Sequence, residues 1–412
     1  MLLAGAGCNS APAPAANRTI TVAQSGQADV VGADNVALQK AAAMLKPGDT
    51  LLIKEGTYTM ENGLYLPSSV TVKGVAGKTI LRKGAGVSSA LTEDGDFDEV
   101  ELLVAEPEKF RPGMGISVLD DQQNQGWNVT TTTITSVEGN RVRIWPRTVR
   151  DYELEQNHAR IQNTFPILCV VEGKDVVIED IIVDGNKDEN GYLDGCRGGA
   201  IYIYRSNNVT VRNCVARNYN GDGISFQVTD GIKVLDSESY SQTGLGIHPG
   251  TGSSNALVKG CHTHDNGQDG LYLCWRVRQG EFTDNIIENN GREGISIGHK
   301  DTDNLFTNNK IIGNHIAGVF FRRETFKNSG HRNTFRDNVI ENNGNAKEGY
   351  GFLILPKAGD IVIENNRIAE TRGAKGTQRY GVYKVRGAGK VTLSGNLIEG
   401  ELIKDYAEGA RP

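Results

Sequence analysis

A histidine, an arginine and a lysine fall at positions from which they could act together on an acidic substrate. His248 is followed by Pro249 and Gly250, a rigid turn that holds one orientation of the imidazole ring. An imidazole titrates near neutral pH and can remove a proton next to a carboxylate. Arg276 and Lys300 could neutralise the enediolate that forms. This pattern predicts a base-catalysed elimination, and an exposed histidine that only makes turn hydrogen bonds is the competing interpretation.

Three carboxylates offer a different chemistry. Asp222, Asp269 and Glu293 each stand immediately before the glycine of a recurring short motif. If each motif is one rung of a stack, Asp269 and Glu293 lie about 5 Å apart, and Asp222 and Asp269 about 10 Å apart. These separations are close to those of the carboxyl pairs in retaining and inverting glycosidases. A glycoside hydrolase is therefore the alternative, although an acid before a glycine is also typical of a tight turn.

Aromatic, amide and charged side chains accompany these groups on the same strands and on the turns after them. Rings stack on sugar faces, while cations and amides bind hydroxyls and carboxylates. The sequence therefore predicts a polysaccharide, and an acidic one in particular, as the partner. A non-catalytic glycan-binding protein would carry the same rings without proton-transfer groups. The residues assigned to substrate binding are Tyr202, Gln227, Tyr272, Trp275, His299, Lys300, Arg322, Arg323 and Glu324.

A short acidic segment after His299 is a candidate for a calcium site. Asp301 and Asp303 alternate with polar residues, and Ca²⁺ prefers carboxylate and amide oxygens as ligands. An Asx turn between two strands would have the same composition. Neither reaction considered above requires a metal or an organic cofactor, so we expect no cofactor to be essential and treat Ca²⁺ as optional.

The elements that must position these residues form a repeat. A small residue followed by alternating side chains recurs every 23 or 24 residues from Ala200 to Gly318, and a second alternating segment lies between successive copies. Alternation punctuated by glycine and asparagine predicts short strands and tight turns. A unit of this length cannot bury its own apolar face and must stack on its neighbours. The sequence therefore predicts an all-β fold, a right-handed parallel β-helix.

The alternation sorts side chains into an inside and an outside. The first and third positions after the motif glycine carry apolar residues such as Ile224, Leu271 and Ile295, which we expect in the core. The residue before the glycine and the second and fourth residues after it then face solvent. The candidate catalytic residues fall on that outer face or on the turn behind it. The repeat thus predicts one groove along five successive rungs.

Four segments are predicted along the chain. Residues 1–18 are interpreted as a lipoprotein-type signal and linker, and 19–91 as an N-terminal cap with the first coils. Residues 92–160 break the period and are interpreted as an inserted β-module, and 161–412 as the main coils. Within the second segment Asp34 can cap an amphipathic helix that closes the apolar end of the solenoid.

Composition and charge exclude several classes of protein. The chain has 44 basic and 50 acidic side chains, a net charge of −6, and no basic block for binding nucleic acid. No apolar run reaches the ~20 residues of a membrane-spanning helix.

Cys8 follows a short apolar segment, which predicts a lipid-anchored bacterial protein exported to the periplasm or the outer membrane. The other cysteines include no CxxC pair, so neither a zinc site nor a disulfide framework is expected.

The run from Gly246 to Ile297 resembles the β-helix of mannuronan C5-epimerases and, more broadly, of the pectate-lyase-like superfamily. The similarity lies in the coil lengths, in the HDNGQDG turn at residues 264–270 and in the position of Pro249. The resemblance implies a parallel β-helix, a groove at this place on it and an acidic polysaccharide as substrate.

The catalytic motif of that family is not preserved in this chain. Its Asp-Pro-His segment would fall on residues 248–250, with a histidine in place of the acid and a glycine in place of the catalytic histidine. A second family acid would fall on Cys274, and an arginine matches at Arg292 or Arg276. We therefore expect the substrate class to carry over and predict a polysaccharide lyase, acting by β-elimination on a uronate, rather than an epimerase.

Overall fold

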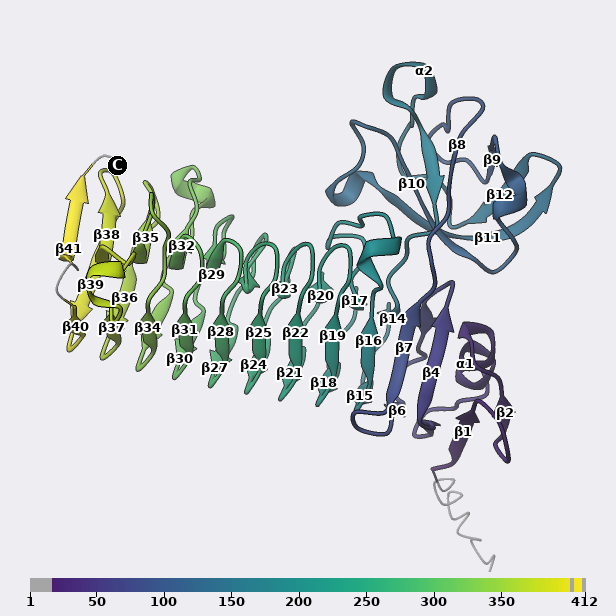
Figure 1. The fold of residues 1–412 in the computed structure, drawn as a ribbon, viewed down its shortest axis with the longest axis horizontal. Helices are drawn as coiled ribbons and strands as arrows, with labels where there is room; N and C mark the ends of the chain where they lie inside the picture. Colours follow the sequence, from purple (N-terminus) through teal and green to yellow (C-terminus); the bar gives the residue numbers. More distant parts are fainter. Residues whose placement is uncertain (1–16, 401–403, 410–412) are drawn as a thin grey trace, which may run out of the picture.

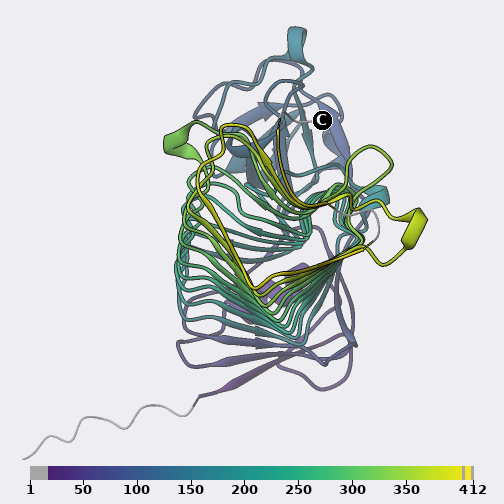
Figure 2. The same ribbon diagram turned by 90° about the vertical axis from the view of Figure 1, so that its left-hand side faces the viewer.

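The computed structural model describes residues 17–400 and 404–409, so the predicted lipidation site, Cys8, lies outside the described residues. The described chain winds into a long right-handed parallel β-helix, which confirms the predicted fold (Figure 1). Viewed along the long axis, successive coils are nested with similar outlines (Figure 2). No helix within the described ranges is both long enough and apolar enough to cross a membrane.

Successive coils of the shaft supply strands to three parallel sheets. In the order in which its strands pair, the first sheet contains β2 (Val30–Val31), β1 (Thr19–Ala23), β3 (Thr50–Ile53), β6 (Thr71–Lys73), β15 (Val177–Glu179), β18 (Thr210–Arg212), β21 (Lys233–Leu235), β24 (Leu257–Lys259), β27 (Glu281–Thr283), β30 (Leu305–Thr307), β33 (Thr334–Arg336), β36 (Ile361–Glu364) and β39 (Val391–Ser394). The second contains β4 (Gly56–Met60), β7 (Thr79–Lys83), β16 (Ile182–Asp184), β19 (Val215–Arg217), β22 (Glu238–Tyr240), β25 (His262–His264), β28 (Ile286–Glu288), β31 (Lys310–Ile312), β34 (Val339–Glu341), β37 (Arg367–Ala369) and β40 (Leu397–Glu399). The third contains β5 (Leu64–Tyr65), β14 (Leu168–Val171), β17 (Ile201–Tyr204), β20 (Ile224–Gln227), β23 (Ile247–Pro249), β26 (Leu271–Tyr272), β29 (Glu293–Ile297), β32 (Ala317–Phe321), β35 (Tyr350–Ile354), β38 (Tyr380–Val385) and β41 (Lys404–Gly409).

The core of the shaft is formed by the inward residues of all three sheets. Ile224, Leu271 and Ile295, which the alternation places inside, are each at most 1% exposed. On the first sheet, Phe282, Phe306 and Phe335 stack ring on ring, with centroids 4.8 and 4.4 Å apart. Identical or similar side chains from neighbouring coils therefore pack in columns along the axis, as the repeat requires.

Buried asparagines hold the turns between the first and second sheets. Asn309 is typical, because its Nδ2 donates to the Phe282 carbonyl at 2.8 Å and to Asn338 Oδ1 at 2.9 Å. Its own Oδ1 accepts from the backbone N–H and from Nδ2 of Asn285, at 3.0 and 2.9 Å. Each asparagine thus satisfies backbone groups that a buried turn would leave unpaired. The ladder consists of Asn285, Asn309, Asn338, Asn366 and Asn396, the residues that share one place in the repeat.

A helix closes the N-terminal end of the shaft. Helix α1 (Asn35–Ala42) begins after Asp34, whose Oδ1 accepts from the Ala37 N–H at 2.9 Å, as the N-cap prediction requires. Leu38 and Ala41 on its inner face are fully buried. The helix lies against the first strands, at the end opposite β41 (Figure 1).

An antiparallel sheet is inserted between the first coils and the rest of the shaft. It has its own apolar core and stands above the N-terminal coils (Figure 1). The Trp127 ring lies 5.5 Å from the Tyr204 ring and 5.1 Å from the Arg197 guanidinium, so the insert contacts the third sheet. Its strands are β8 (Ser88–Ala90), β13 (Arg160–Gln162), β10 (Gly115–Leu119), β11 (Thr130–Glu138), β12 (Arg141–Trp145) and β9 (Glu101–Leu103). The short helices of the described chain are η1 (Pro107–Lys109), η2 (Gly126–Asn128), α2 (Leu154–Asn157), η3 (Lys187–Glu189), η4 (Phe326–Asn328) and η5 (Gly373–Lys375).

Candidate active site

The loop between β16 and β17 folds back over the outer face of the third sheet. The Tyr202 hydroxyl donates to the Cys196 carbonyl at 2.7 Å and ties the loop down. A Cβ on Gly195 would stand 1.7 Å from Asp222 Oδ2 and 2.6 Å from His248 Nδ1, so only glycine allows this approach. The expectation that the outward positions face solvent is therefore wrong for Asp222 and His248, which are 2% and 3% exposed.

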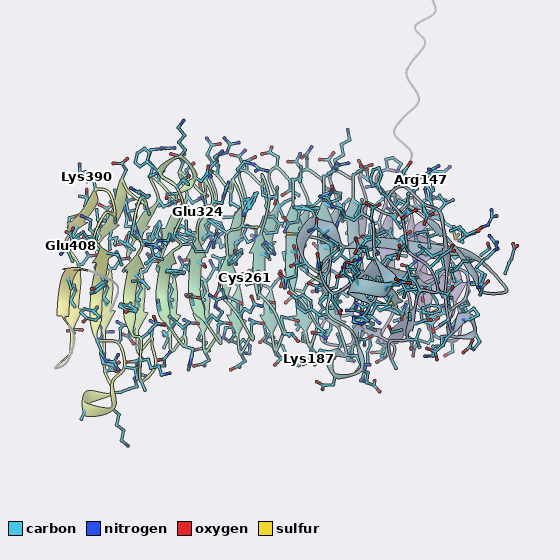
Figure 3. The ribbon with its side chains drawn as sticks, turned by 90° about the horizontal axis from the view of Figure 1, so that it is seen from above. Arg147, Lys187, Cys261, Glu324, Lys390 and Glu408 are labelled. Carbon is cyan, nitrogen blue, oxygen red and sulfur yellow. The ribbon has the colours of Figure 1, made fainter. Side chains whose placement is uncertain are left out.

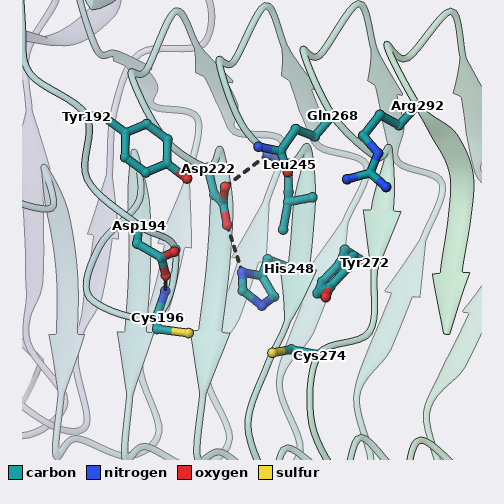
Figure 4. A pocket seen from close by; sticks show the side chains of 11 residues that line it. Tyr192, Asp194, Cys196, Asp222, Leu245, His248, Gln268, Tyr272, Cys274 and Arg292 are labelled. Carbon is teal, nitrogen blue, oxygen red and sulfur yellow. Dashed lines mark hydrogen bonds and ion pairs between the residues drawn. The ribbon is translucent and has the colours of Figure 1, made fainter. Parts of the chain in front are cut away.

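A cavity of about 200 Å³ lies where this loop meets the sheet. It gathers Asp222, His248 and Tyr272 from the residues predicted by the sequence, and adds groups that the repeat did not point to. Asp194 is held in place by the Cys196 N–H, which donates to its Oδ1 at 2.9 Å. The lining residues are Tyr192, Asp194, Gly195, Cys196, Asp222, Leu245, His248, Gln268, Tyr272, Cys274 and Arg292 (Figure 4).

The centre of the cavity is a buried pair of His248 and Asp222. His248 Nδ1 lies 2.7 Å from Asp222 Oδ2, and the Leu245 N–H donates to Asp222 Oδ1 at 2.9 Å (Figure 4). Burial alone would lower the pKa of His248, but hydrogen bonds and charges from Asp222 and Cys274 raise it to about 10. At neutral pH the ring is therefore an imidazolium and a proton donor, whereas the sequence suggested a neutral base.

Two cysteines complete the centre. The sulfur atoms of Cys196 and Cys274 point toward one another beside the His248 ring (Figure 4). Hydrogen bonds with Cys196 and with His248 outweigh burial and hold the pKa of the Cys274 thiol well below its usual value. The hydrogen bond with Cys274, together with burial, raises the pKa of the Cys196 thiol. The cavity thus sets a thiol of lowered pKa against a second thiol and the His248 ring, the arrangement of an activated cysteine.

Two arginines stand near this centre in different roles. Arg292 lines the cavity with a half-exposed side chain, and its Nε lies 3.3 Å from Glu293 Oε2. Arg322, predicted to bind substrate, instead lies 4.1 Å from the centroid of the Tyr272 ring. Its guanidinium donates to the Leu273 carbonyl at 2.5 Å, so it fixes the wall of the cavity from outside the lining. Arg292 is the cation that a substrate carboxylate could meet.

Gln227 is fully buried, so the expectation that it contacts substrate directly is wrong. Its Oε1 accepts from the Thr251 N–H at 2.8 Å, and its Nε2 donates to Ser225 Oγ at 3.0 Å and lies 3.4 Å from His248 Nε2. A Cβ on Gly250 would stand 1.9 Å from Gln227 Oε1. Gln227 therefore occupies the space in which a side chain at position 250 would begin, and it contacts the His248 ring.

Asp269 and Glu293 do not line the cavity, although they do form a pair. They are 2% and 3% exposed, and the Glu293 N–H donates to Asp269 Oδ1 at 3.1 Å. Burial and the neighbouring Asp269 raise the pKa of Glu293 to about 9, so the pair carries a proton at neutral pH. The two expected outward positions are thus buried.

Trp275, His299 and Glu324 lie together on the turns beyond the cavity. The Trp275 and His299 rings stack with centroids 4.2 Å apart, and His299 Nδ1 lies 3.4 Å from Glu324 Oε2. Glu324 lies toward the C-terminal half of the shaft, away from Arg147 of the insert (Figure 3). The half-exposed Trp275 keeps a face that can stack on a sugar.

The remaining cations predicted for this face lie outside the cavity. Arg276 and Lys300 are turn residues with left-handed backbone, φ 63° and 59°, and Arg323 is exposed. At the C-terminal end of the five predicted rungs, Ala317 and Phe320 pack into an apolar cluster that continues over the outer face of β35 and β38. This apolar cluster consists of Ala317, Phe320, Tyr350, Leu353, Leu355, Tyr383 and Val385.

The calcium candidate does not form a cation site. Asp301 is fully buried, and its two oxygens accept from the backbone N–H groups of Val277 and Gly298 at 3.0 and 2.8 Å. Asp303 is paired with Arg332 through two hydrogen bonds of 2.7 and 2.8 Å. The competing interpretation, an Asx turn between two strands, fits this segment, because its carboxylates accept backbone hydrogen bonds or pair with an arginine.

Comparisons with known proteins agree with this architecture. A family model described as a right handed beta helix region matches residues 181–335, which include the whole lining of the cavity. Over 150 residues the chain is 27% identical to mannuronan C5-epimerase AlgE5 of Azotobacter vinelandii. The match covers 36% of this chain and only 13% of that protein. The similarity to this class of epimerases, stated from the coils alone, is confirmed.

Two solved structures share the fold over nearly their whole length. The A-module of mannuronan C-5 epimerase AlgE4 of A. vinelandii has a TM-score of 0.54 at 16% identity, over 92% of this chain and 96% of the module. The polygalacturonase of Erwinia carotovora ssp. carotovora has a TM-score of 0.56 at 13% identity, over 97% and 99%. At such identities the likeness shows the fold alone. The chain is thus a right-handed parallel β-helix protein, similar in sequence to mannuronan C5-epimerases over its central coils.

Proposed function

We propose that the protein is an exported polysaccharide lyase that cleaves a uronate-containing glycan by β-elimination. The observation that carries the proposal is the buried line of Asp222, His248 and Cys274, which ends in a cavity with Arg292 in its wall. The epimerase relatives support the substrate class, because their name states a reaction on a polyuronate. The polygalacturonase that shares the fold is named for its action on another polyuronate.

The cavity fits one sugar unit at a time. Its volume of about 200 Å³ is below the range of about 300–1,000 Å³ found for most ligand sites. Tyr192 also lines a second cavity, which Gln125 and Arg160 of the insert share. A polymer can therefore place one residue beside Cys274 while its neighbours run along the face of the insert.

The residues divide the work of an elimination as follows. The Cys274 thiolate removes the proton from C5 of the uronate, and Arg292 neutralises the carboxylate as negative charge develops on it. The electron pair forms the C4–C5 double bond while the bond from C4 to the glycosidic oxygen breaks. The His248 imidazolium gives its proton to that leaving oxygen, and Asp222 holds the ring in place. Transfer of the proton from the Cys274 thiol to His248 restores the starting state.

A second candidate function, C5 epimerisation, is favoured by the Cys196 thiol that faces Cys274. It begins with the same proton removal, but a proton is then returned to the opposite side of C5, so the substrate must first separate the two sulfur atoms that are hydrogen-bonded in the free protein. Hydrolysis has less support, because Asp269 and Glu293 lie outside the cavity and Asp222 is bound to His248.

The proposal is tested with purified polymannuronate, polyguluronate and polygalacturonate, with a neutral glycan as control. A lyase produces an ultraviolet-absorbing unsaturated end together with each new reducing end. We expect Cys274→Ser and His248→Ala to lose this activity, while Asp269→Asn and Cys214→Ala, which alter buried groups outside the cavity, retain it. Reducing ends without absorbance would support a hydrolase, and binding without any change in the polymer would support a glycan-binding protein.

A further inference from the structure

The second sheet carries two histidines and two glutamates on its outer face, away from the cavity. His262 and His264 flank Thr263 on β25, and Thr263 is buried, so both imidazole rings point outward. In the parallel register Glu238 of β22 lies beside His262, and Glu288 of β28 lies beside His264. Three neighbouring coils therefore bring nitrogen and oxygen donors to one place.

Three of these donor atoms converge. Glu238 Oε1 lies 3.1 Å from His264 Nε2 and 3.8 Å from His262 Nδ1, and all three atoms lie within 4.8 Å of one another. A tetrahedral zinc ion with bonds of about 2.0–2.1 Å needs its donors about 3.3–3.4 Å apart. The distance from Glu238 Oε1 to His264 Nε2 is close to this value, and His262 must turn toward these two atoms to complete the set.

The other nitrogen of each imidazole faces a carboxylate. His262 Nε2 lies 2.9 Å from Glu288 Oε1, and His264 Nδ1 lies 2.7 Å from Asp265 Oδ2. The Tyr240 ring stacks on His264 with centroids 5.0 Å apart and an interplanar angle of 9°. A carboxylate behind each ring is the usual support of a metal-bound histidine, because it fixes the tautomer and orients the free nitrogen toward the metal.

We propose that Glu238, His262 and His264 bind a divalent transition metal, with Zn²⁺ as the preferred ion, and that Glu288 and Asp265 position the two rings. Two imidazoles and one carboxylate suit zinc, whereas Ca²⁺ and Mg²⁺ prefer oxygen ligands alone. The ligands come from β22 and β25, so the bound metal joins two adjacent coils and stabilises the folded shaft. The site lies on a different sheet from the cavity and does not depend on the proposed function.

The experiment titrates Zn²⁺ into the full chain by calorimetry, after removal of metals with a chelator. Because thiolates also bind zinc, every protein in the series carries Cys196→Ser and Cys274→Ser. We expect one Zn²⁺ per chain, and a loss of affinity of at least about 100-fold in His262→Ala and in His264→Ala. Glu288→Gln, which alters only a positioning residue, should weaken binding by about 10–100-fold.

His158→Ala is the matched control, because His158 Nδ1 also faces a carboxylate, Asp121 at 2.7 Å, without further histidines. It should bind Zn²⁺ like the parent. Thermal unfolding provides a second measurement, in which Zn²⁺ raises Tm in the parent and in His158→Ala but not in the His262 and His264 variants. Failure of the parent to bind Zn²⁺, or equal affinity in all variants, would overturn the proposal and leave the cluster as an ion-pair network.

Discussion

At the scale of single residues, the cavity joins groups whose protonation states depend on one another. The pKa of His248 is raised because Asp222 and Cys274 surround it, and the pKa of Cys274 is lowered because Cys196 and His248 face it. The alternation in the sequence pointed to His248, Asp222 and Tyr272. It could not point to Cys196, because the loop that carries it has no period, and Cys274 was noted only as the replacement of an acid.

Alkylation measures the state of Cys274. A lowered pKa means that the thiolate persists below the usual pKa of about 8.5, so Cys274 should react with iodoacetamide at pH 6. His248→Ala removes a hydrogen bond that holds this pKa down, and should slow the reaction at pH 6 by about tenfold or more. Mass spectrometry of the Cys274 peptide gives the rates, with buried Cys214 as the internal reference. Equal rates in both proteins would contradict the pairing.

The pKa of His248 can be followed by NMR of its ring protons. It should remain protonated up to about pH 10 in the wild-type protein. In the folded state this pKa lies above the unfolded value of about 6.5, so the pair stabilises the fold below pH 6.5 and this contribution is lost as pH rises toward 10. Asp222→Asn should lower the pKa of His248, because burial lowers this pKa and an amide raises it less than a carboxylate does. An unchanged titration would show that Asp222 does not hold the proton.

At the scale of elements, the asparagine ladder was visible in the sequence as one residue type at one place of each repeat. Asn309→Leu removes the groups that pair with Asn285, Phe282 and Asn338, and leaves buried polar atoms unsatisfied. We expect a loss of at least about 2 kcal/mol in the free energy of unfolding. Urea denaturation measures it, with the exposed Asn207→Ala as control. A loss no larger than that of the control would contradict the role of the ladder.

The loop between β16 and β17 is the element that the repeat could not predict, and it decides which outward residues are buried. Gly195→Ala places a methyl group against Asp222 and His248, so the loop must shift away from the pair. We expect at least a tenfold loss in kcat/KM on the uronate substrate with little change in Tm, because the shaft core is untouched. Gly84→Ala is the control for an added methyl group, because a Cβ there would meet its nearest neighbour at 3.5 Å, an ordinary contact. Equal activity in the two variants would contradict the role of the loop.

At the scale of the whole molecule, the period of the sequence was sufficient to predict the β-helix, because every coil must bury its apolar face against its neighbours. It was not sufficient to predict which outward positions are buried. The outward positions of the C-terminal strands hold rings and aliphatic groups such as Phe320, Leu353 and Tyr383, which pack on one another and close that part of the face. The insert, which has a separate apolar core, lies beside the N-terminal coils of the shaft (Figure 1).

Because the shaft and the insert have separate cores, a substitution in one core should destabilise that part of the molecule most. Phe306→Ala removes the middle ring of the Phe282–Phe335 stack and should cost about 3–5 kcal/mol. Hydrogen exchange should speed up most in the coils around β27, β30 and β33, and least in β8–β13. Uniform acceleration over both parts would show that the insert and the shaft unfold as one unit.

The central claim, proton removal from C5 of a uronate by Cys274, is tested most directly with a polyuronate labelled with tritium at C5. The wild-type protein should release the label into water, whether the product is an unsaturated end or the epimer. Cys274→Ser should release none, while Asp269→Asn should release it like the wild type. Cleavage of the polymer by the wild-type protein with all the tritium retained would contradict the account.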